Sequence, residues 1–343
     1  MKVDVPLHAA SPVEAGPAAR RIEELGYDGA FGFEGPHDPF LPLVVAATQT
    51  HRIALGTAVA IAFARNPMNL AQLAYDLQLA SQGRFVLGLG TQVRAHVQRR
   101  FSMPWSQPAA RMREMALAIR AIWRAWHERE RLDFRGEFYT HTLMPPIFDP
   151  GPNPYGLPRL FLAGVGPRMT EVAGEVADGF FVHPLHTPLS IRTLTLPALE
   201  RGLARAGRAR EAFEISCQVM IATGESEAEL ERSREAVRAQ IAFYGSTPAY
   251  LPVLACHGRE ALHQELHALS RQGAWAEMGK RVDDELLHAV AVVGRPGEIA
   301  PRLRERCAFA DRVILMSQWA PDPAALREIA EQLRSPATRA SRG

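Results

Sequence analysis

A carboxylate, an imidazole and a second carboxylate stand within five residues of one another near the N-terminus, at Glu34, His37 and Asp38. An imidazole changes its charge near neutral pH, and a neighbouring carboxylate can tune it, so this cluster could perform general acid–base chemistry. The alternative is that His37 and Asp38 cap the following helix, because Asp38 precedes Pro39. We favour the catalytic interpretation, with which capping is compatible.

A second candidate site is the glycine pair in Gly164, Val165 and Gly166, just before a helix predicted to begin at Pro167. Glycines let backbone N–H groups approach an anion closely, and a helix N-terminus adds a favourable dipole. Arg168 could add a positive charge. A tight turn is the alternative for such a pair taken by itself, but its place after a predicted strand favours phosphate binding.

Two other motifs are weaker evidence of a binding or metal site. Gly88–Gly90 begins like a dinucleotide fingerprint, but Val93 stands where that fingerprint needs its third Gly or Ala. His263 and His267 are four residues apart, but Gln264 occupies the position where a zinc protease needs its Glu. We interpret this histidine pair as a solvated helix face and predict no metal site.

The elements that must position these residues alternate along almost the whole chain. Eight short apolar runs, often bounded by glycine, are typical of strands buried on both faces. These predicted strands are Val3–Leu7, Gly29–Phe33, Ile53–Ala60, Arg84–Leu89, Arg159–Ala163, Gly179–His183, Glu214–Ala222 and Arg312–Ser317. Helices are predicted at Ser11–Leu25, Pro42–Thr50, Pro67–Ser81, Gln107–Trp126, Pro167–Val176, Pro188–Ala206, Glu227–Tyr244, Arg259–Arg271 and Gly297–Arg306.

Eight strands separated by helices predict an α/β fold in which a parallel sheet closes into a (β/α)8 TIM barrel, with an open doubly wound sheet as the rival. We predict one barrel domain over residues 1–334, with insertions near 91–106, 128–158 and 245–290, and a flexible tail over 335–343. Function in such a barrel belongs to the loops after the C-terminal ends of the strands, where both candidate sites fall.

Composition narrows the class of partner. The 343 residues contain 39 Lys and Arg against 37 Asp and Glu, a formal net charge of +2, which gives no reason to expect nucleic acid or an anionic membrane. No apolar stretch reaches the roughly 18 residues needed to cross a bilayer. The three cysteines are far apart, which fits a reducing compartment. We expect a cytoplasmic protein that acts on a small molecule.

Several stretches resemble the bacterial-luciferase-like flavin monooxygenase superfamily, in the same order from about Val3 to Ser317. They are residues 52–58 (RIALGTA), 65–67 (RNP), 81–90 (SQGRFVLGLG), 163–166 (AGVG) and 177–179 (ADG). Three more stretches look like the branch of this superfamily that uses the deazaflavin coenzyme F420 instead of FMN. These are residues 37–40 (HDPF), 99–105 (RRFSMPW) and 136–141 (GEFYTH).

The resemblance implies a (β/α)8 fold, usually dimeric, with a flavin-type ring at the C-terminal mouth of the barrel. It implies that the loop after the fifth strand holds the cofactor phosphate, in agreement with the anion argument above. It also implies a bulge behind the ring, often with a non-proline cis peptide, at Ala60, Ile61 and Ala62. The expected cofactor-binding residues are Ala60, Ile61, Ala62, Thr91, Gly164, Val165, Gly166, Arg168 and Met169.

One departure concerns the catalytic histidine. Many deazaflavin-using relatives have Asp-His directly after the second strand, whereas this chain has Glu34 at the position of the acid and Gly35 at that of the histidine. We therefore assign proton transfer to His37, two residues later, with Glu34 or Asp38 tuning it.

From this resemblance we expect an F420-dependent oxidoreductase that transfers a hydride between the deazaflavin and a small organic substrate, as a homodimer. One alternative is an FMN-dependent two-component monooxygenase. Another is a non-catalytic flavin-binding protein, which would not need the polar set of Glu34, His37 and Asp38. The expected substrate pocket consists of His8, Phe33, Phe63, Gln92, His96, His183 and Trp319.

Overall fold

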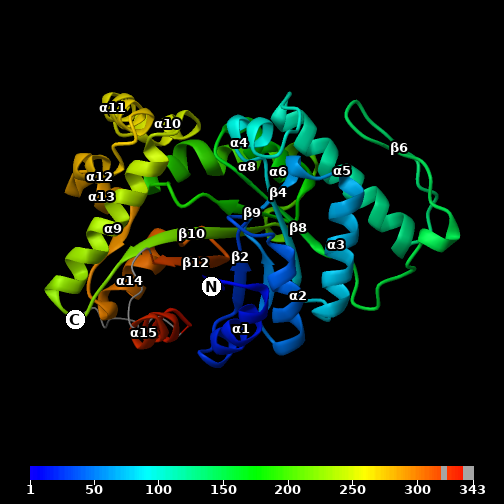
Figure 1. The fold of residues 1–343 in the computed structure, drawn as a ribbon, viewed down its shortest axis with the longest axis horizontal. Helices are drawn as coiled ribbons and strands as arrows, with labels where there is room; N and C mark the ends of the chain where they lie inside the picture. The colour runs from blue at the N-terminus through cyan, green and yellow to red at the C-terminus, as the bar shows by residue number, and fades with distance from the viewer. Residues whose placement is uncertain (318–322, 335–343) are drawn as a thin grey trace.

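Eight parallel strands form a closed ring in the computed structural model, which describes residues 1–317 and 323–334 (Figure 1). Each ring strand pairs with a neighbour on both sides, and β1 closes the ring by pairing with β12. The predicted TIM barrel is confirmed and the open sheet is wrong. In ring order the strands are β1 (Lys2–Pro6), β2 (Gly29–Gly32), β3 (Ala54–Thr57), β5 (Phe85–Gly90), β8 (Arg159–Gly164), β9 (Gly179–Val182), β10 (Glu214–Ala222) and β12 (Arg312–Ser317).

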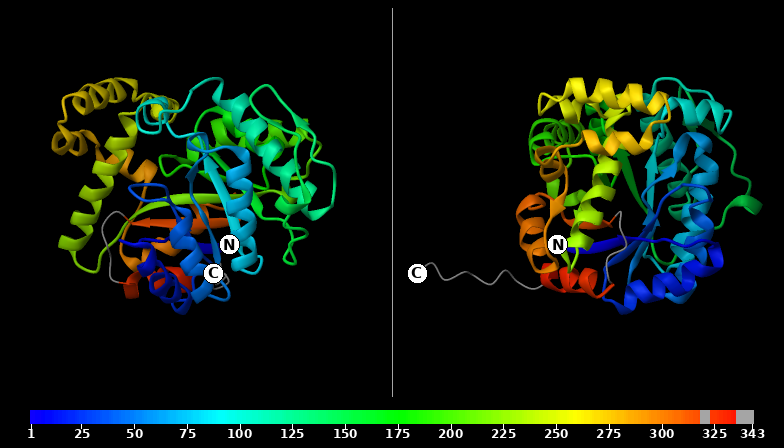
Figure 2. Two further views of the ribbon diagram at one scale, coloured as in Figure 1. Left: turned by 45° about the vertical axis from the view of Figure 1, so that its right-hand side comes forward. Right: turned by 60° about the vertical axis from the view of Figure 1, so that its left-hand side comes forward.

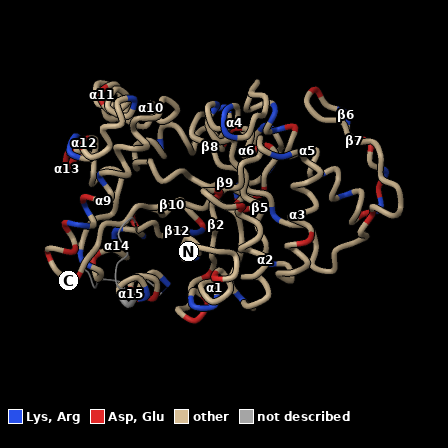
Figure 3. The backbone as a smooth tube through the Cα atoms, viewed as in Figure 1, with Lys and Arg blue, Asp and Glu red and all other residues tan. Residues whose placement is uncertain are grey.

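Helices surround the ring, as Figures 1 and 2 show. The predicted helices are confirmed to within a few residues at most ends, and α15 is added near the C-terminus. Acidic and basic residues are interspersed along the outer helices (Figure 3). The main outer helices are α1 (Ala15–Glu24), α2 (Phe40–Gln49), α3 (Pro67–Ala80), α5 (Pro108–His127), α6 (Pro167–Val176), α8 (Leu196–Arg205), α9 (Glu227–Gly245), α14 (Pro296–Arg306) and α15 (Pro323–Arg334).

One predicted helix is interrupted. The segment expected to be helical over Pro188–Ala206 consists of α7 (Pro188–Ser190), the π-helical turn η4 (Ile191–Thr195) and α8. Pro197 lies near the start of α8 and has no N–H, and its ring would clash with the carbonyl four residues before it in a regular helix. A wider π turn at this place avoids that clash.

The three insertions contain short elements of their own. The first holds α4 (Arg94–Arg99), and the second is mostly extended and projects beside α3 and α5 in Figure 1. The second insertion contains β6 (Phe134–Arg135), β7 (Thr140–His141) and η3 (Pro146–Phe148). The third contains η6 (Pro248–Tyr250), α10 (Leu251–Ala255), α11 (Glu260–Arg271), α12 (Trp275–Met278), η7 (Gly279–Arg281) and α13 (Asp284–Val290), and the short strand β11 (Val292–Val293) follows it.

The histidine pair on α11 corrects one interpretation. His263 is buried, and its Nδ1 lies 2.7 Å from the Gly245 carbonyl at the end of α9. His267 Nδ1 lies 3.0 Å from the Ser246 carbonyl, and the two imidazoles stack. A solvated face is therefore wrong for His263, because the pair connects α11 to the carbonyls at the C-terminal end of α9.

Packing inside the barrel explains one glycine of the Gly88–Gly90 segment. A Cβ on Gly88 would lie 1.9 Å from the Thr57 carbonyl oxygen, so only glycine fits between β3 and β5 at this height. The Thr57 hydroxyl donates to the Gly88 carbonyl at 2.7 Å and accepts from the Gly88 N–H at 2.9 Å. Gly88 is required by close strand packing.

Candidate active site at the barrel mouth

The predicted site residues follow strands whose C-terminal ends meet at one rim of the ring. Because all eight ring strands are parallel, the loops that leave them on this side form a common mouth. His8 follows β1, residues 33–38 follow β2, Thr91 follows β5 and His183 follows β9, while the glycine pair lies at the end of β8, whose last residue is Gly164. The helix α4 and the helices of the third insertion lie at the same end of the molecule (Figures 1 and 2).

Glu34 is held in an ion pair that sequence reasoning missed. Its side chain is 5% exposed, and its Oε2 atom accepts from Arg65 Nη1 at 2.7 Å and from the Ile61 N–H at 2.7 Å. Burial opposes the charge on Arg65, but hydrogen bonds and ion pairs with Glu34 and Asp38 raise its pKa above the ordinary value. Glu34 therefore fixes the short strand β4 (Ala60–Ile61) against the rim.

Asp38 caps the following helix. Its Oδ1 atom accepts from the Phe40 N–H, the first of α2, at 2.8 Å, and its Oδ2 atom accepts from Arg65 Nη2 at 2.9 Å. The capping alternative is confirmed for this residue. Arg65 thus connects Glu34 and Asp38 across the loop between β2 and α2.

His37 differs from these two carboxylates in being unengaged. Its side chain is exposed and forms no hydrogen bond with another described residue. Arg100, at the end of α4, donates to the Gly35 carbonyl at 2.6 Å and so holds the loop that carries His37. The imidazole is thereby presented at the mouth with both ring nitrogens available to a ligand.

The glycine pair forms an open cradle at the start of α6. A Cβ on Gly164 would lie 2.5 Å from Met169 Cγ, whereas a Cβ on Gly166 would meet no atom within 4 Å. The first-turn N–H groups of Arg168 and Met169 have no partner within the helix, because α6 begins at Pro167. Arg168 is exposed and pairs with no described residue. Free N–H groups, open space and a cation fit a phosphate.

The segment expected to back the cofactor ring needs one correction. The non-proline cis peptide joins Ala58 and Val59, two residues before Ala60, so it lies ahead of the expected bulge. The strand predicted over Ile53–Ala60 is divided there into β3 and β4, and β4 pairs with β5. The side chains of Ala60, Ile61 and Ala62 are all buried.

Of two further expected pocket residues, Phe63 does not reach the surface, and Gln92 is half-buried with a local hydrogen bond. Phe63 is fully buried between Trp105, 5.7 Å away between ring centroids, and the guanidinium of Arg111, so it supports the mouth from behind and is wrong as a surface wall. Gln92 adopts a left-handed backbone with φ of 60°, and its own Oε1 accepts from the Val93 N–H.

Other expected pocket residues remain available to a ligand. Phe33 is 54% exposed, with the His8 ring 6.4 Å away edge-on, and His96 is also exposed. The Thr91 hydroxyl donates to the carbonyl of its neighbour at 2.9 Å. Trp319 lies outside the described residues. The ligand-binding roles of all these residues stay predictions.

His183 lies in an aromatic cage. Its ring stacks on Tyr250 at 4.4 Å and meets Tyr244 edge-on at 4.6 Å. Burial lowers the pKa of His183 to about 3, so the ring is neutral at pH 7, and its Nδ1 accepts from the Leu185 N–H. Its one proton is therefore on Nε2. Neither tyrosine was predicted, because no pattern in the sequence links the end of α9, which carries Tyr244, or the third insertion, which carries Tyr250, to β9.

Two kinds of feature are absent from residues 1–317 and 323–334, namely a membrane-spanning helix and a cluster of metal ligands. Within them, no helix combines the length and apolar character needed to cross a bilayer. Over the same residues, no three His, Cys, Asp or Glu side chains gather in a way that could hold a metal ion.

Comparison with known proteins places this geometry in a family. An uncharacterised protein of Mycobacterium tuberculosis (strain H37Rv) is 55% identical over 301 residues, 88% of each chain. The 5,10-methylenetetrahydromethanopterin reductase of Archaeoglobus fulgidus is 28% identical over 288 residues, 82% of this chain and 81% of that protein. The solved coenzyme F420 dependent tetrahydromethanopterin reductase of Methanopyrus kandleri has the same fold, with a TM-score of 0.79 and 18% identity over 97% of both chains. The model of the luciferase-like monooxygenase family matches residues 2–312, and this chain therefore belongs to that family of oxidoreductases.

Proposed function

We propose that this protein is an F420-dependent oxidoreductase that transfers a hydride between the deazaflavin and a small organic substrate. The structural observation that carries the proposal is the open cradle at Gly166, which lies on the same rim as the exposed imidazole of His37. The names of the relatives from Archaeoglobus fulgidus and Methanopyrus kandleri support the choice of reaction and of coenzyme.

Each part of the mouth has a task under this proposal. The N–H groups at the start of α6 and the side chain of Arg168 would hold the cofactor phosphate. The strand β4, which the Glu34–Arg65 pair fixes, would support the ring from beneath. When bound, the deazaflavin supplies a carbon atom that accepts or donates a hydride. His37 would give or take the substrate proton, and its exposure leaves room for the substrate.

The neutral ring of His183 would contribute differently. With its Nδ1 occupied by the Leu185 N–H, it offers a single donor at Nε2, which suits orientation of a substrate oxygen. Tyr244 and Tyr250 pack against this histidine, and burial lowers its pKa to about 3. His183 would therefore position a substrate without exchanging a proton with it at neutral pH.

Titration of the purified protein with F420 and, separately, with FMN tests this proposal. We expect saturable F420 binding in the micromolar range, followed by the fluorescence of the deazaflavin, and much weaker FMN binding. FMN binding without F420 binding would instead favour the two-component monooxygenase. Binding of either cofactor without turnover of any substrate would favour the non-catalytic alternative.

A glycine substitution tests the cradle itself. Gly166 has φ of −89° and ψ of 152°, which any residue can adopt, and the space above it is open. Gly166→Val should therefore fold normally and weaken cofactor binding at least tenfold, because its side chain would occupy the phosphate position. Gly297→Val, at an exposed helix start where a Cβ meets only one atom at 3.9 Å, is the matched control. Equal affinity in both variants would contradict the assignment.

We also propose that the protein acts in the cytoplasm as a homodimer. Helix α2 exposes Leu41 and Val44 by 58% and 44%, and apolar side chains of this kind are what a subunit interface covers. Light scattering on a sizing column should give about twice the chain mass of 37.8 kDa. A monomer at micromolar concentration would contradict this expectation.

A further inference from the structure

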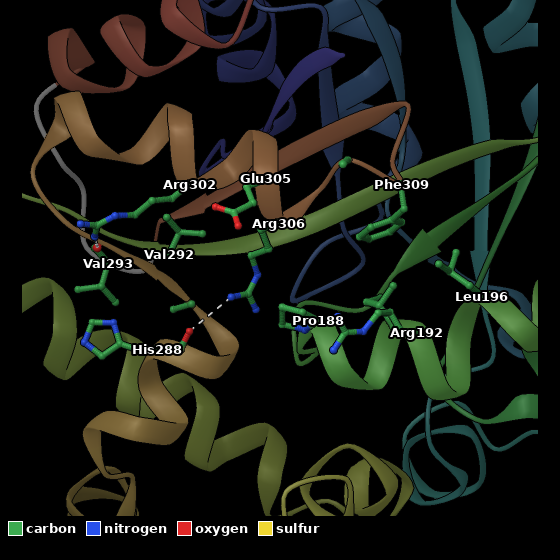
Figure 4. A pocket seen from close by; sticks show the side chains of 13 residues that line it. Pro188, Arg192, Leu196, His288, Val292, Val293, Arg302, Glu305, Arg306 and Phe309 are labelled. Carbon is green, nitrogen blue, oxygen red and sulfur yellow. Dashed lines mark hydrogen bonds between the residues drawn. The ribbon is translucent and has the colours of Figure 1, made fainter. Parts of the chain in front are cut away.

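A cavity of about 720 Å³ lies on the outer wall of the barrel, between the η4–α8 helix and α14 (Figure 4). Its walls come from the outer helices and from β11, so it is separate from the residues placed at the mouth. A volume of this size is typical of sites that bind small molecules. The mechanism proposed above makes no use of it.

Most of the cavity wall is apolar. Ile191 and Leu196 contribute from the helix on one side, Phe309 follows α14 on the other, and Val292 of β11 lies between them. A ligand with an apolar body would gain about 25 cal/mol for each Å² that it removes from water on these side chains. The wall therefore favours a ligand that is more than a bare ion.

Three arginines and one glutamate supply the ionised side chains of the wall. Arg302 is engaged, since it donates to the Val293 carbonyl and to Glu298. Arg306 donates through Nη2 to the Ala289 carbonyl at 2.6 Å and to the Val290 carbonyl at 2.7 Å. Its Nε is buried without a partner among the described residues. Carbonyl partners leave its positive charge uncompensated.

Arg192 is the cation most available to a ligand. It is exposed and forms no hydrogen bond or ion pair with a described residue. Figure 4 shows the side chains of Arg192 and Arg306 extending toward the space between the two helices. The π turn η4 carries Arg192 together with Ile191, and such turns frequently occur at functional sites. Pro197 makes this turn a feature that the sequence itself encodes.

We propose that this cavity binds a small organic monoanion with an apolar body, of which a medium-chain carboxylate is the simplest example. The carboxylate pairs with Arg192 and lies in the positive potential of Arg306, and the apolar body packs on Ile191, Leu196 and Phe309. Because Glu298 already pairs with Arg302, the charges of Arg192 and Arg306 face only that of Glu305, and this positive excess disfavours a cationic ligand. A wholly apolar ligand would cover charged groups without pairing them, which is costly.

Calorimetric titration of the full chain with sodium octanoate tests this proposal. We expect one saturable site per chain, at least tenfold weaker binding in Arg192→Met, and at least tenfold weaker binding of the neutral probe 1-octanol. Methionine retains much of the side-chain length without the charge. Because Arg192 is exposed, this substitution should leave the fold intact, so weaker binding would reflect the lost charge. Arg201→Met, at another exposed arginine of the same helix, should bind octanoate as the unmodified protein does.

Three results would overturn the proposal. The first is no octanoate binding, or equal affinity for octanoate and 1-octanol. The second is an equal loss in Arg192→Met and Arg201→Met, which would indicate a general effect of surface charge. The third is a loss of octanoate binding in Arg168→Met but not in Arg192→Met, which would place the carboxylate at the mouth of the barrel.

Discussion

Replacing Arg65 with methionine removes the cation that holds Glu34 at the rim of the barrel. The carboxylate of Glu34 is 2.7 Å from Arg65 Nη1, its side chain is only 5% exposed, and the Ile61 N–H would be its one remaining partner of those identified. Removing one partner of a buried ion pair typically costs about 3–5 kcal/mol. Because Arg65 is itself 16% exposed, water can partly replace it, and we expect a loss near the lower end, about 3 kcal/mol.

A double-mutant cycle separates this charge effect from lost packing. The amide oxygen in Glu34→Gln can still accept from the Ile61 N–H but carries no charge, so Glu34→Gln combined with Arg65→Met should recover much of the stability. We expect a coupling energy of about 1.5–3 kcal/mol between the two substitutions, measured by urea unfolding followed by tryptophan fluorescence.

The exposed pair Arg21–Glu24 provides the matched control. Its atoms are 3.9 Å apart and its side chains are 65% and 58% exposed, so Arg21→Met should change stability by less than about 0.5 kcal/mol. A loss in Arg65→Met no larger than that in Arg21→Met, or a coupling energy near zero, would refute the argument that Glu34 is a buried charge dependent on Arg65.

Three further substitutions have defined outcomes. Burial holds the pKa of His183 at about 3, below its ordinary 6.5, so stability should fall as pH falls from 6.5 toward 3, because only the unfolded chain takes up this proton. His183→Phe should reduce the pH dependence of the unfolding free energy by up to about 1.4 kcal/mol per pH unit, measured by urea unfolding between pH 7 and 4. An unchanged pH dependence would refute this expectation. His37→Ala should lower kcat about 100-fold in an F420-linked assay if His37 transfers the proton, whereas His51→Ala should not, and full activity in His37→Ala removes that role. Gly88→Ala should lose at least about 3 kcal/mol, because a Cβ 1.9 Å from a backbone oxygen cannot be relieved by side-chain rotation, and an unaltered thermal midpoint would contradict the observed strand spacing.

Local patterns were enough to predict the eight ring strands and most of the main outer helices. The buried stripe of α5 recurs every three or four residues, and α3 begins where Asn66 accepts from the Asn69 N–H ahead of a proline, as expected for helix starts. The alternation of strands and helices then predicted the barrel, and the barrel predicted the rim on which the candidate residues lie. The interruption of the helix over residues 188–206 was the main local error, although Pro197 was a visible signal for it.

Contacts between distant segments could not be predicted in this way. Arg65 is 31 residues from Glu34, and the tyrosines that enclose His183 come from beyond β10. The residue types of His37 and Asp38 were compatible with both acid–base catalysis and helix capping. The structure distinguishes the two residues, since Asp38 caps α2 and His37 is exposed at the mouth without a hydrogen bond to a described residue.

The sequence by itself determined the secondary structure, the closed α/β architecture and the loops in which chemistry could occur, because periodicity, capping and glycine placement act between residues a few positions apart. Only the tertiary structure decided which side chains meet, which charges are paired and where a cavity opens on the outer wall. Those properties depend on how the insertions fold over the ring and on contacts between side chains far apart in the chain, and neither is written in any local pattern.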